Sequence, residues 1–398
     1  MRSGERQPER GRALGRAKAG GARRLASWAW ATLRTGSVAV VLGLAALGCG
    51  QDHPQRAAAD GTAGAAAGAP SAEPPAFEDQ EFKAMGGMAI RIRAWGSPAG
   101  ALGRALPRCQ QLVETLEQQV STFRESSLVS QLNRAAGKPL VADADSFELI
   151  ERALGWSQRT RGAFDPTVGP LVELWRTAGR TGRWPLPEEI GAARARVGGT
   201  RIGLDRGSRS VTVAAGTELD LAAIAEGFAA DRLASLLRAE GVRRARIDVG
   251  GELRLYDDRP HPEPFRIGIR HPLQDGMIAE LRLGSGAVAT SGCYEGHAQA
   301  GGRRICHVID PRSGMPVERT LSATVVAAQC TDADALDTAL LVLGPAEGIQ
   351  LAESLPGINA LIVAAPTEGA GAEVVMSAGL LPMVSLHATA PAPAGSGL

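Results

Sequence analysis

Hydrophobic residues recur along the chain with two different periods. Apolar positions three and four residues apart predict helices over 102–120, 145–160, 224–240 and 333–355. Alternating runs typical of strands lie between them: "MAIRIRAW" (88–95), "SVTVAA" (210–215), "RARIDV" (244–249), "FRIGIR" (265–270), "IAELRLG" (278–284), "SATVVAA" (322–328) and "NALIVAA" (359–365). Many of these runs are close enough in sequence to pair as hairpins. We therefore predict an α+β fold in which mainly antiparallel sheets pack with helices.

The first 49 residues have the pattern of an export signal. Residues 1–34 contain nine Lys or Arg and two Glu, and an apolar run that ends at Cys49 follows them. This run is shorter than the roughly 20 apolar residues of a transmembrane helix, and its last residues, "ALGC", resemble a bacterial lipobox. We predict that Cys49 is lipidated and that the protein is anchored to a membrane on the periplasmic side of the cell envelope. Ordinary cleavage nearby is the alternative, because Ala46 and Leu47 depart from the usual box.

Composition divides the remaining chain into three parts. Residues 50–76, rich in Ala, Gly and Pro, predict a disordered tether, and residues 385–398 predict a disordered tail. The folded domain is predicted over 77–384. The whole chain of 398 residues is 44% hydrophobic and 21% charged with a net charge of +1, which is typical of a globular protein and indicates no nucleic-acid-binding surface.

Four cysteines follow Cys49, at positions 109, 293, 306 and 330. They form no CxxC pair and no Cys/His zinc pattern, so the default expectation is four isolated small hydrophobic side chains. An oxidising compartment would permit disulfides among them, and the sequence does not determine the pairing.

The segment "TDADALDTAL" (331–340) places three acids in an otherwise apolar helix. Asp334 and Thr338 are four residues apart and share one face of that helix, opposite its leucines. A carboxylate beside a hydroxyl can hold a hard cation. The alternative is a solvated polar face in which Asp332 caps the helix and Asp337 is exposed.

Five glycine-containing segments carry polar residues that a generic fold does not explain. In "ELDLAAIAEGFAADRL" (218–233), Gly227 interrupts a helical pattern at a cost of about 1 kcal/mol relative to Ala, so we expect a close approach to its backbone. Glycine beside Ser or Thr can hold phosphate through backbone N–H groups. Ordinary turns, such as an Asp165-Pro166 turn before a helix, are the alternative. The other four segments are "GAFDPTVGPLVELW" (162–175), "RIDVGGELRLY" (246–256), "VATSGCYE" (288–295) and "HVIDPRSGMP" (307–316).

Taken in order, these segments resemble the motifs of the ApbE family. The resemblance also includes "AMGGMAIRIRAWG", "VSTFRESSLVSQLN", "DADALDTALLVLG" and "INALIV", and it covers nearly all of residues 82–365. It implies an ApbE-like (T-fold-like) domain that transfers FMN from FAD to a Thr or Ser hydroxyl of an acceptor redox protein, with Mg²⁺, and releases AMP. A related hydrolase that converts FAD to FMN and AMP, and a flavin-binding lipoprotein without catalysis, are the alternatives.

The resemblance also implies the residues of the site. Asp334 and Thr338 would bind Mg²⁺ through their side chains, and Ala223 through its main-chain carbonyl. Asp332 and Asp337 do not match the family's ligand positions, so we predict that Asp332 caps the helix and that Asp337 is solvated. Phe123 would stack on the flavin ring, and His307 would act as the base that accepts the proton of the acceptor hydroxyl. The remaining residues on the FAD side are Met85, Ala163, Phe164, Asp165, Asp220 and Glu226. For all of them, turn and core roles are the alternative.

Overall fold

The computed structural model of the protein describes residues 40–42, 77–294, 298–365 and 372–387, and for residues 40–42 only the backbone. All of these residues belong to one compact unit, Ser37–Leu398. Cys49 and the predicted tether (50–76) lie outside the described residues. β1 (Val40–Leu42) falls within the segment predicted to be a signal, which stays a prediction.

A nine-stranded sheet forms the framework of the described fold, with the order β1-β16-β15-β14-β11-β8-β7-β3-β2. Neighbouring strands in it are antiparallel throughout, which confirms the prediction of mainly antiparallel sheets. Besides β1, its strands are β2 (Phe77–Ala84), β3 (Met88–Trp95), β7 (Arg244–Val249), β8 (Glu252–Asp257), β11 (Gly286–Gly292), β14 (Thr320–Ala327), β15 (Asn359–Ala364) and β16 (Glu373–Met376).

Three smaller sheets complete the described β structure, with the orders β17-β10-β9, β12-β13 and β4-β6-β5. β17 (Val384–Leu386) runs into the segment predicted as a tail, whose residues 388–398 lie outside the described part. The other strands are β4 (Leu140–Val141), β5 (Ile202–Asp205), β6 (Ser210–Val213), β9 (Phe265–Arg270), β10 (Met277–Leu283), β12 (Ala298–Ala300) and β13 (Arg303–Ile305).

The four predicted helices are confirmed as α1 (Ala101–Val120), α3 (Ala144–Arg159), α6 (Ala222–Ala239) and α7 (Cys330–Ser354). Two more, α2 (Leu128–Arg134) and α5 (Pro187–Arg194), were not predicted, and α4 (Gly169–Thr181) is the helix that the alternative interpretation of the Asp165-Pro166 turn expected. α4 has readable boundaries, because Pro170 lies in its first turn and the left-handed Gly182 (φ 68°) ends it. Two short 3₁₀ helices are η1 (Gly199–Arg201) and η2 (Ala378–Met383). Among the described residues, no helix has the length and apolar composition needed to span a membrane.

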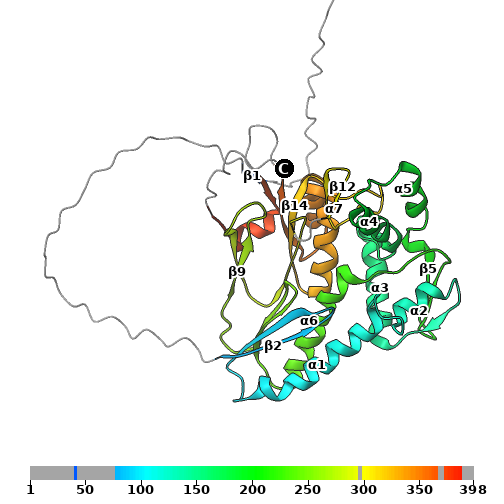
Figure 1. The fold of residues 1–398 in the computed structure, drawn as a ribbon. Coiled ribbons are helices and arrows are strands. Elements are labelled where there is room, and N and C mark those ends of the chain that lie inside the picture. The colour runs from blue at the N-terminus through cyan, green and yellow to red at the C-terminus, as the bar shows by residue number, and fades with distance from the viewer. Residues whose placement is uncertain (1–39, 43–76, 295–297, 366–371, 388–398) are drawn as a thin grey trace, which may run out of the picture. The chain divides into compact units, whose positions relative to one another are not determined.

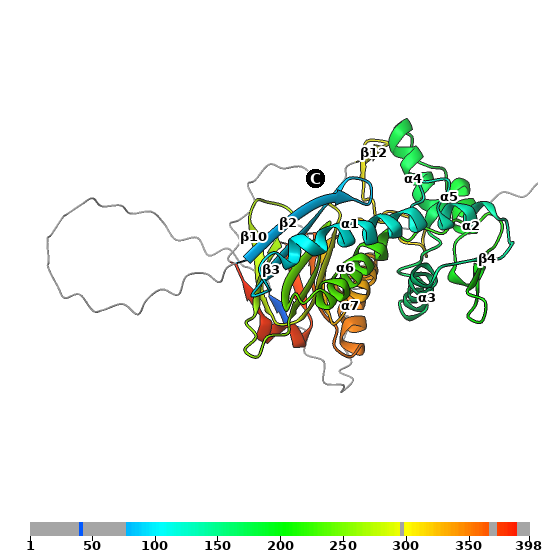
Figure 2. The same ribbon diagram turned by 90° about the horizontal axis from the view of Figure 1, so that it is seen from below.

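The two faces of the large sheet bury different partners. Figures 1 and 2 show α6 and α7 against one face of the large sheet, with α1 beside α6. α3 packs next to α6 and α7, and α2 joins α1 to the sheet of β4–β6, whereas α4 and α5 lie beside β12. Along β15, Ile362 packs into the helical core, and its neighbours Leu361 and Val363 pack against β9 and β10. Both faces of β15 are therefore buried, which agrees with its continuous apolar sequence.

Candidate active site

Gly227 lies where α6 meets α7. A Cβ at this position would lie 2.3 Å from the carbonyl oxygen of Cys330 and 2.8 Å from Cβ of Asp334. The close approach that the sequence predicted at Gly227 is therefore the backbone of α7. The Gly227 amide donates a hydrogen bond to Asp334 Oδ2 at 2.8 Å, which fixes the predicted metal ligand against α6.

Ala223 lies at a break in the first turn of α6. Its backbone (φ −81°, ψ 25°) departs from helical geometry. In a regular helix its carbonyl would accept a hydrogen bond from the amide four residues later, and that amide, of Gly227, donates to Asp334. Both features suit a carbonyl that is turned to another partner.

The N-terminus of α7 is capped from α6. Asp231 accepts hydrogen bonds from the amides of Cys330 (3.0 Å) and Thr331 (2.9 Å), and Arg254 pairs with it at 2.9 Å. The prediction that Asp332 is the cap is wrong. Its carboxylate instead accepts from Arg152 Nη2 (2.7 Å) and Trp156 Nε1 (2.8 Å), which joins α7 to α3.

The supposed polar face of α7 is buried. Asp334 is 6% exposed and Asp337 is fully buried, so the prediction of a solvated Asp337 is wrong. Burial raises the pKa of both carboxyl groups, and the neighbouring charge of Asp334 adds to the upward shift of the Asp337 pKa. No Lys or Arg of the described residues forms an ion pair with either acid. Two buried carboxylates without a cationic partner are costly.

These residues fit a magnesium ion. Mg²⁺ is commonly bound by one or two carboxylates, with waters and substrate phosphates in the remaining positions. The described part of the chain contains no group of three or more His, Cys, Asp or Glu side chains that could hold a metal ion. Asp334, Thr338 and the Ala223 carbonyl stay a prediction for the ligand set, and the buried carboxylates suit it.

Ser291 joins β11 to this part of α7. Its Oγ lies 3.0 Å from Asp337 Oδ1 and 3.2 Å from Thr338 Oγ1. Two residues further on, Cys293 forms a disulfide with Cys306, with a Cα–Cα distance of 5.0 Å. Two of the four cysteines are thus paired rather than isolated, whereas Cys109 and Cys330 are free and buried.

The disulfide holds the segment of His307, the predicted base, next to the end of β11. His307 directly follows Cys306 and is exposed, so the covalent link holds its segment next to the end of β11. The turn after it is closed by Asp310, whose Oδ1 accepts from the amide (2.9 Å) and Nε (3.0 Å) of Arg312. His307 takes no part in these contacts.

The predicted residues of the "GAFDP" segment are buried in a tight turn before α4. Asp165 accepts hydrogen bonds from the Thr167 amide (2.9 Å) and hydroxyl (2.5 Å), from Ser157 Oγ (3.0 Å) and from the Gly199 amide (3.1 Å). Its carboxylate therefore holds the turn together. Ala163 and Phe164 are 1% and 3% exposed. Their side chains belong to the core.

Asp220 connects this turn to α6. Its amide donates to the carbonyl of Pro166 at 2.7 Å, and its Oδ1 accepts from the Ala222 amide at 2.9 Å. Glu226, one turn into α6, lies next to the β7–β8 hairpin: a Cβ at Gly250 would be 2.5 Å from Glu226 Oε2 and 2.2 Å from Met88 Sδ. Asp220, just before α6, thus contacts the turn at Pro166, and Glu226, within α6, lies against the turn at Gly250.

Glu117 on α1 links the two remaining flavin-side segments. Its carboxylate accepts from the amides of Met85 (2.7 Å) and Gly86 (3.3 Å) in the β2–β3 turn and from Arg124 Nη2 (3.1 Å). Burial raises the pKa of Glu117, but the hydrogen bonds from Arg124 and from the Met85 amide lower it further, so the pKa lies below its usual value. Met85 has a left-handed backbone (φ 50°), and this carboxylate stabilises that strained turn.

Phe123, next to Arg124, is 82% exposed. The Cζ of Arg176, on α4, lies 5.6 Å from the centre of its ring. The large exposed fraction leaves part of the ring accessible to a planar ligand.

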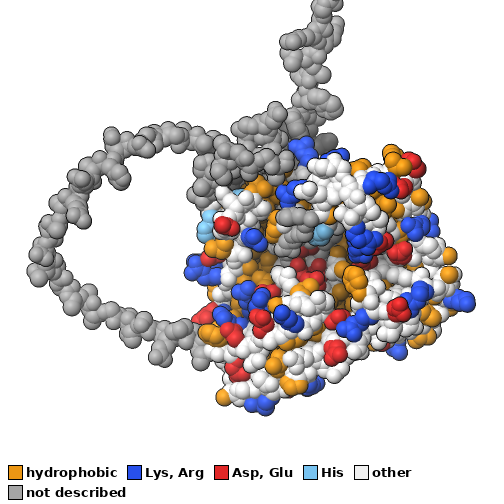
Figure 3. Space-filling model, in the orientation of Figure 1, with side chains coloured by type: hydrophobic (Ala, Val, Ile, Leu, Met, Phe, Trp, Pro, Cys, Tyr) orange, Lys and Arg blue, Asp and Glu red, His pale blue; other side chains and the backbone are white. Residues whose placement is uncertain are grey.

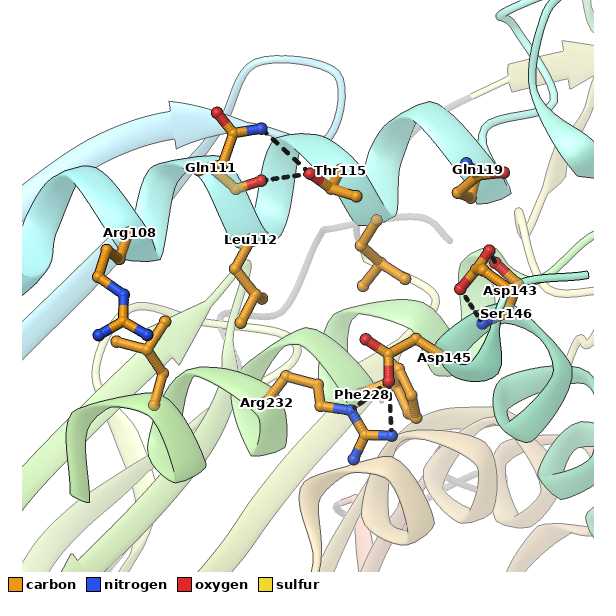
Figure 4. A pocket seen from close by; sticks show the side chains of 12 residues that line it. Arg108, Gln111, Leu112, Thr115, Gln119, Asp143, Asp145, Ser146, Phe228 and Arg232 are labelled. Atoms are coloured by element: carbon orange, nitrogen blue, oxygen red, sulfur yellow. Dashed lines mark hydrogen bonds and ion pairs between the residues drawn. The ribbon is translucent and has the colours of Figure 1, made fainter. Parts of the chain in front are cut away.

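Two cavities are lined by none of the predicted site residues. One of about 320 Å³ opens between α1, α3 and α6, where Figure 4 shows Gln111 and Thr115 hydrogen-bonded to each other on α1 and Arg232 of α6 paired with Asp145 of α3. The other, of about 380 Å³, lies over β2, β3 and β7. Neither contains a predicted site residue, so neither is a candidate reaction centre. On the face shown in Figure 3, basic and acidic side chains are interspersed rather than gathered by sign.

The sequence interpretation gave no site role to four residues of this region: Glu117, Asp231, Ser291 and Asp337. Asp231 and Ser291 lie inside recognised motifs, and Asp337 was seen but interpreted as solvated. Glu117 carries no local signal, because its partners are 31 and 32 residues away in sequence.

The "ApbE family" sequence profile matches residues 87–362. The FAD:protein FMN transferase of Treponema pallidum is 34% identical over 296 residues, which are 70% of this chain and 82% of that protein. The protein of the same name from Salmonella typhimurium is 32% identical over 281 residues, 68% of this chain and 79% of that one. These matches span most of the folded domain.

Solved structures agree with the fold. The crystal structure of the ApbE protein from Thermotoga maritima superposes with a TM-score of 0.68 at 30% identity and covers 77% of this chain and 99% of that one. The flavin transferase ApbE from Vibrio cholerae gives a TM-score of 0.67 at 27% identity and covers 78% of this chain and 100% of its own. The resemblance found in the sequence is confirmed: the chain belongs to the ApbE family.

Proposed function

We propose that this chain is a Mg²⁺-dependent enzyme that transfers FMN from FAD to a Ser or Thr hydroxyl of an acceptor redox protein and releases AMP. The observation that carries the proposal is the pair of buried carboxylates on α7, Asp334 and Asp337, without a basic partner and beside the break in α6. Relatives that are about a third identical bear the name FAD:protein FMN transferase, which supports the same reaction.

Different residues of the chain bind the cation, the flavin ring and the phosphates. Asp334, Thr338 and the Ala223 carbonyl hold the cation, and the exposed Phe123 ring stacks on the flavin. The turns around Gly250 and Gly314, both with positive φ, bring backbone close to the phosphates. When bound, Mg²⁺ neutralises charge on the pyrophosphate and on the departing AMP.

The chemical step is a displacement at the FMN phosphorus. The acceptor oxygen forms a bond to that phosphorus, the bond from it to the bridging oxygen breaks, and the electron pair leaves with AMP. The hydroxyl proton passes to His307, which is exposed and therefore accessible to a protein substrate. With water as the acceptor, the same step would be FAD hydrolysis.

The direct test is transfer to a protein. The full chain is incubated with FAD, Mg²⁺ and purified candidate redox proteins, and acceptor mass and free FMN are followed together. We expect an FMN adduct on a Ser or Thr of one acceptor, loss of the adduct with EDTA, and none with Asp334→Asn. Free FMN and AMP at equal rates with and without an acceptor would instead establish a hydrolase, and bound FAD without turnover a flavin-binding protein.

We also propose that Cys49 is lipidated and holds the enzyme at the periplasmic side of a membrane. The support is the "ALGC" sequence after an apolar run. In a bacterial host, Cys49→Ser should move the protein from the membrane fraction to the soluble periplasm. Equal membrane association of both forms would refute the anchor without affecting the catalytic proposal.

A further inference from the structure

Asp337 has an oxygen that nothing in the described part of the protein satisfies. The residue is fully buried, and its Oδ2 has no hydrogen-bond partner there. Its Oδ1 accepts from Ser291 Oγ at 3.0 Å and lies 3.4 Å from Thr338 Oγ1. A proton on Oδ2 would find no acceptor, whereas a cation would occupy the free lone pair. An unpartnered buried carboxylate oxygen is costly unless such a partner arrives.

Hydrogen bonds bring three oxygens together around Asp337 Oδ1, at separations somewhat longer than those between neighbouring ligands of Mg²⁺. Ser291 Oγ, Thr338 Oγ1 and Asp337 Oδ1 are 3.0, 3.2 and 3.4 Å from one another. Mg²⁺ binds oxygens at about 2.0–2.1 Å in octahedral geometry, which puts adjacent ligands roughly 2.9 Å apart. Asp337 is three residues after Asp334 and adjacent to Thr338, so α7 presents all three on the side that faces β11 and α6.

We propose that Asp337 is a second anionic residue of the metal site, oriented by Ser291, and that it allows the protein to bind the divalent cation before FAD. This inference rests on the proposed function, because it places Asp337 at the same metal. A site with only Asp334 would carry one negative charge and depend on the pyrophosphate for the rest. With Asp337 as well, two carboxylates balance the double charge of the ion, so the cation is held without nucleotide.

The test measures metal binding without turnover. Mn²⁺ is titrated into the full-length, FAD-free protein, and free Mn²⁺ is followed by electron paramagnetic resonance. Loss of a residue that supports a metal ligand commonly weakens affinity about 10–100-fold, and we expect Asp337→Asn to weaken Mn²⁺ binding by at least about tenfold. Asp332→Asn is the matched control, since it removes one charge from the same helix at a carboxylate bonded to Arg152 and Trp156. It should bind Mn²⁺ as the wild type does.

Two further variants separate the possible failures. Ser291→Ala keeps both carboxylates and should weaken Mn²⁺ binding several-fold, so it tests the proposal even if Asp337→Asn does not fold. Wild-type affinity in a folded Asp337→Asn, or in Ser291→Ala if Asp337→Asn does not fold, overturns the inference. Asp334→Asn tests the metal site itself: if it alone loses Mn²⁺ binding, the proposed function stands and only the role of Asp337 is refuted. If Asp334→Asn also binds Mn²⁺ normally, the metal assignment of the proposed function fails as well.

Discussion

The amide of Gly227 donates a hydrogen bond to the carboxylate of Asp334, 107 residues later in the chain, at 2.8 Å. The bond removes a donor from the helix of α6 at the turn where Ala223 leaves helical geometry. This one contact therefore joins α6 to α7 beside two of the three predicted metal ligands, the Ala223 carbonyl and the Asp334 carboxylate.

Gly227→Ala should be strongly destabilising although alanine is the better helix former. The added Cβ would overlap the Cys330 carbonyl oxygen, at 2.3 Å, and force α6 from α7. Overpacking of this kind costs about 1–3 kcal/mol. Gly155→Ala in α3 is the control, because a Cβ added there would have no atom within 4 Å, and it should gain about 0.5–1 kcal/mol. Urea denaturation measures both, and equal effects would show that the contact is not restrictive.

Periodicity was sufficient for most of the framework. α1 and α3 follow the helical period and β9 the period of two, because each buries one face. β14 and β15 are buried on both faces, and their runs of apolar and β-branched residues identified them. α2 was missed because seven residues are only two turns. The start of α7 was predicted to have a solvated polar face, but it is buried on several sides. The spacing of Asp334 and Thr338 showed that they share a face and could not show that this face is buried.

The residues of the site were found through motifs, and their connections were not. The Cys293–Cys306 pairing depends on how β11 meets the segment before His307, which no local pattern encodes. No local pattern identifies Glu117 either, because its partners, the Met85 amide and Arg124, lie in a turn and a loop that only the fold brings next to α1. Long-range contacts of this kind define the site more than the identity of each residue does.

Phe123→Asn should weaken FAD binding without affecting the fold. The ring is 82% exposed, so the free energy of unfolding should change by less than about 0.5 kcal/mol. Stacking on an aromatic ring is worth about 1–3 kcal/mol, which corresponds to an FAD dissociation constant about 5–150-fold higher. Flavin fluorescence quenching gives the affinity. Phe77→Asn, another exposed phenylalanine at the far end of β2, serves as the control; an equal loss in both variants would refute stacking at Phe123.

His307→Asn should slow FMN transfer and spare FAD affinity. A general base contributes about 10²–10⁴-fold to rate, and the exposed histidine has no described contact whose loss would disturb the fold. Single-turnover transfer from prebound FAD separates the chemical step from binding. His261→Asn, at another exposed histidine in the loop before β9, should retain the wild-type rate. A transfer rate within about threefold of wild type would remove His307 from the mechanism.

Breaking the Cys293–Cys306 bond should reduce both stability and transfer. The bond closes a loop of sequence separation 13, and a loop of about 15 residues is worth roughly 3 kcal/mol. It also holds the His307 segment beside Ser291, so the double variant Cys293→Ser/Cys306→Ser should transfer FMN more slowly at unchanged FAD affinity. Treatment of the wild type with a dithiol should reproduce the loss and leave the double variant unaffected. A dithiol effect of equal size in both would point to another cause.

A buried cluster of charged side chains lies where β7 begins and β8 ends, and it predicts how stability depends on pH. Asp257, whose side chain is 1% exposed, pairs with Arg244 at 2.7 Å and with Arg259 at 2.8 Å. Burial raises its pKa, but the hydrogen bonds from Arg259 and from the Glu263 amide, with the charge of Arg244, hold the pKa well below its usual range. A carboxyl group with a depressed native pKa adds stability above its unfolded pKa, and this stability is lost as the pH falls toward the native value.

Asp257→Asn should therefore be most destabilising at neutral pH. Removal of one member of a buried ion pair costs about 3–5 kcal/mol, and Arg244 would be left in place with a single weaker partner, Glu263, at 3.3 Å. The difference in unfolding free energy between wild type and variant should be constant from pH 7 to about pH 5 and should shrink below about pH 4, near the unfolded pKa of aspartate. Urea denaturation at several pH values measures it. Asp258→Asn removes a more exposed carboxylate, 44% accessible and paired with Arg238, and should cost at most about 1 kcal/mol. A difference for Asp257→Asn that stayed constant down to pH 2 would mean that the ionised carboxylate does not stabilise this end of the sheet.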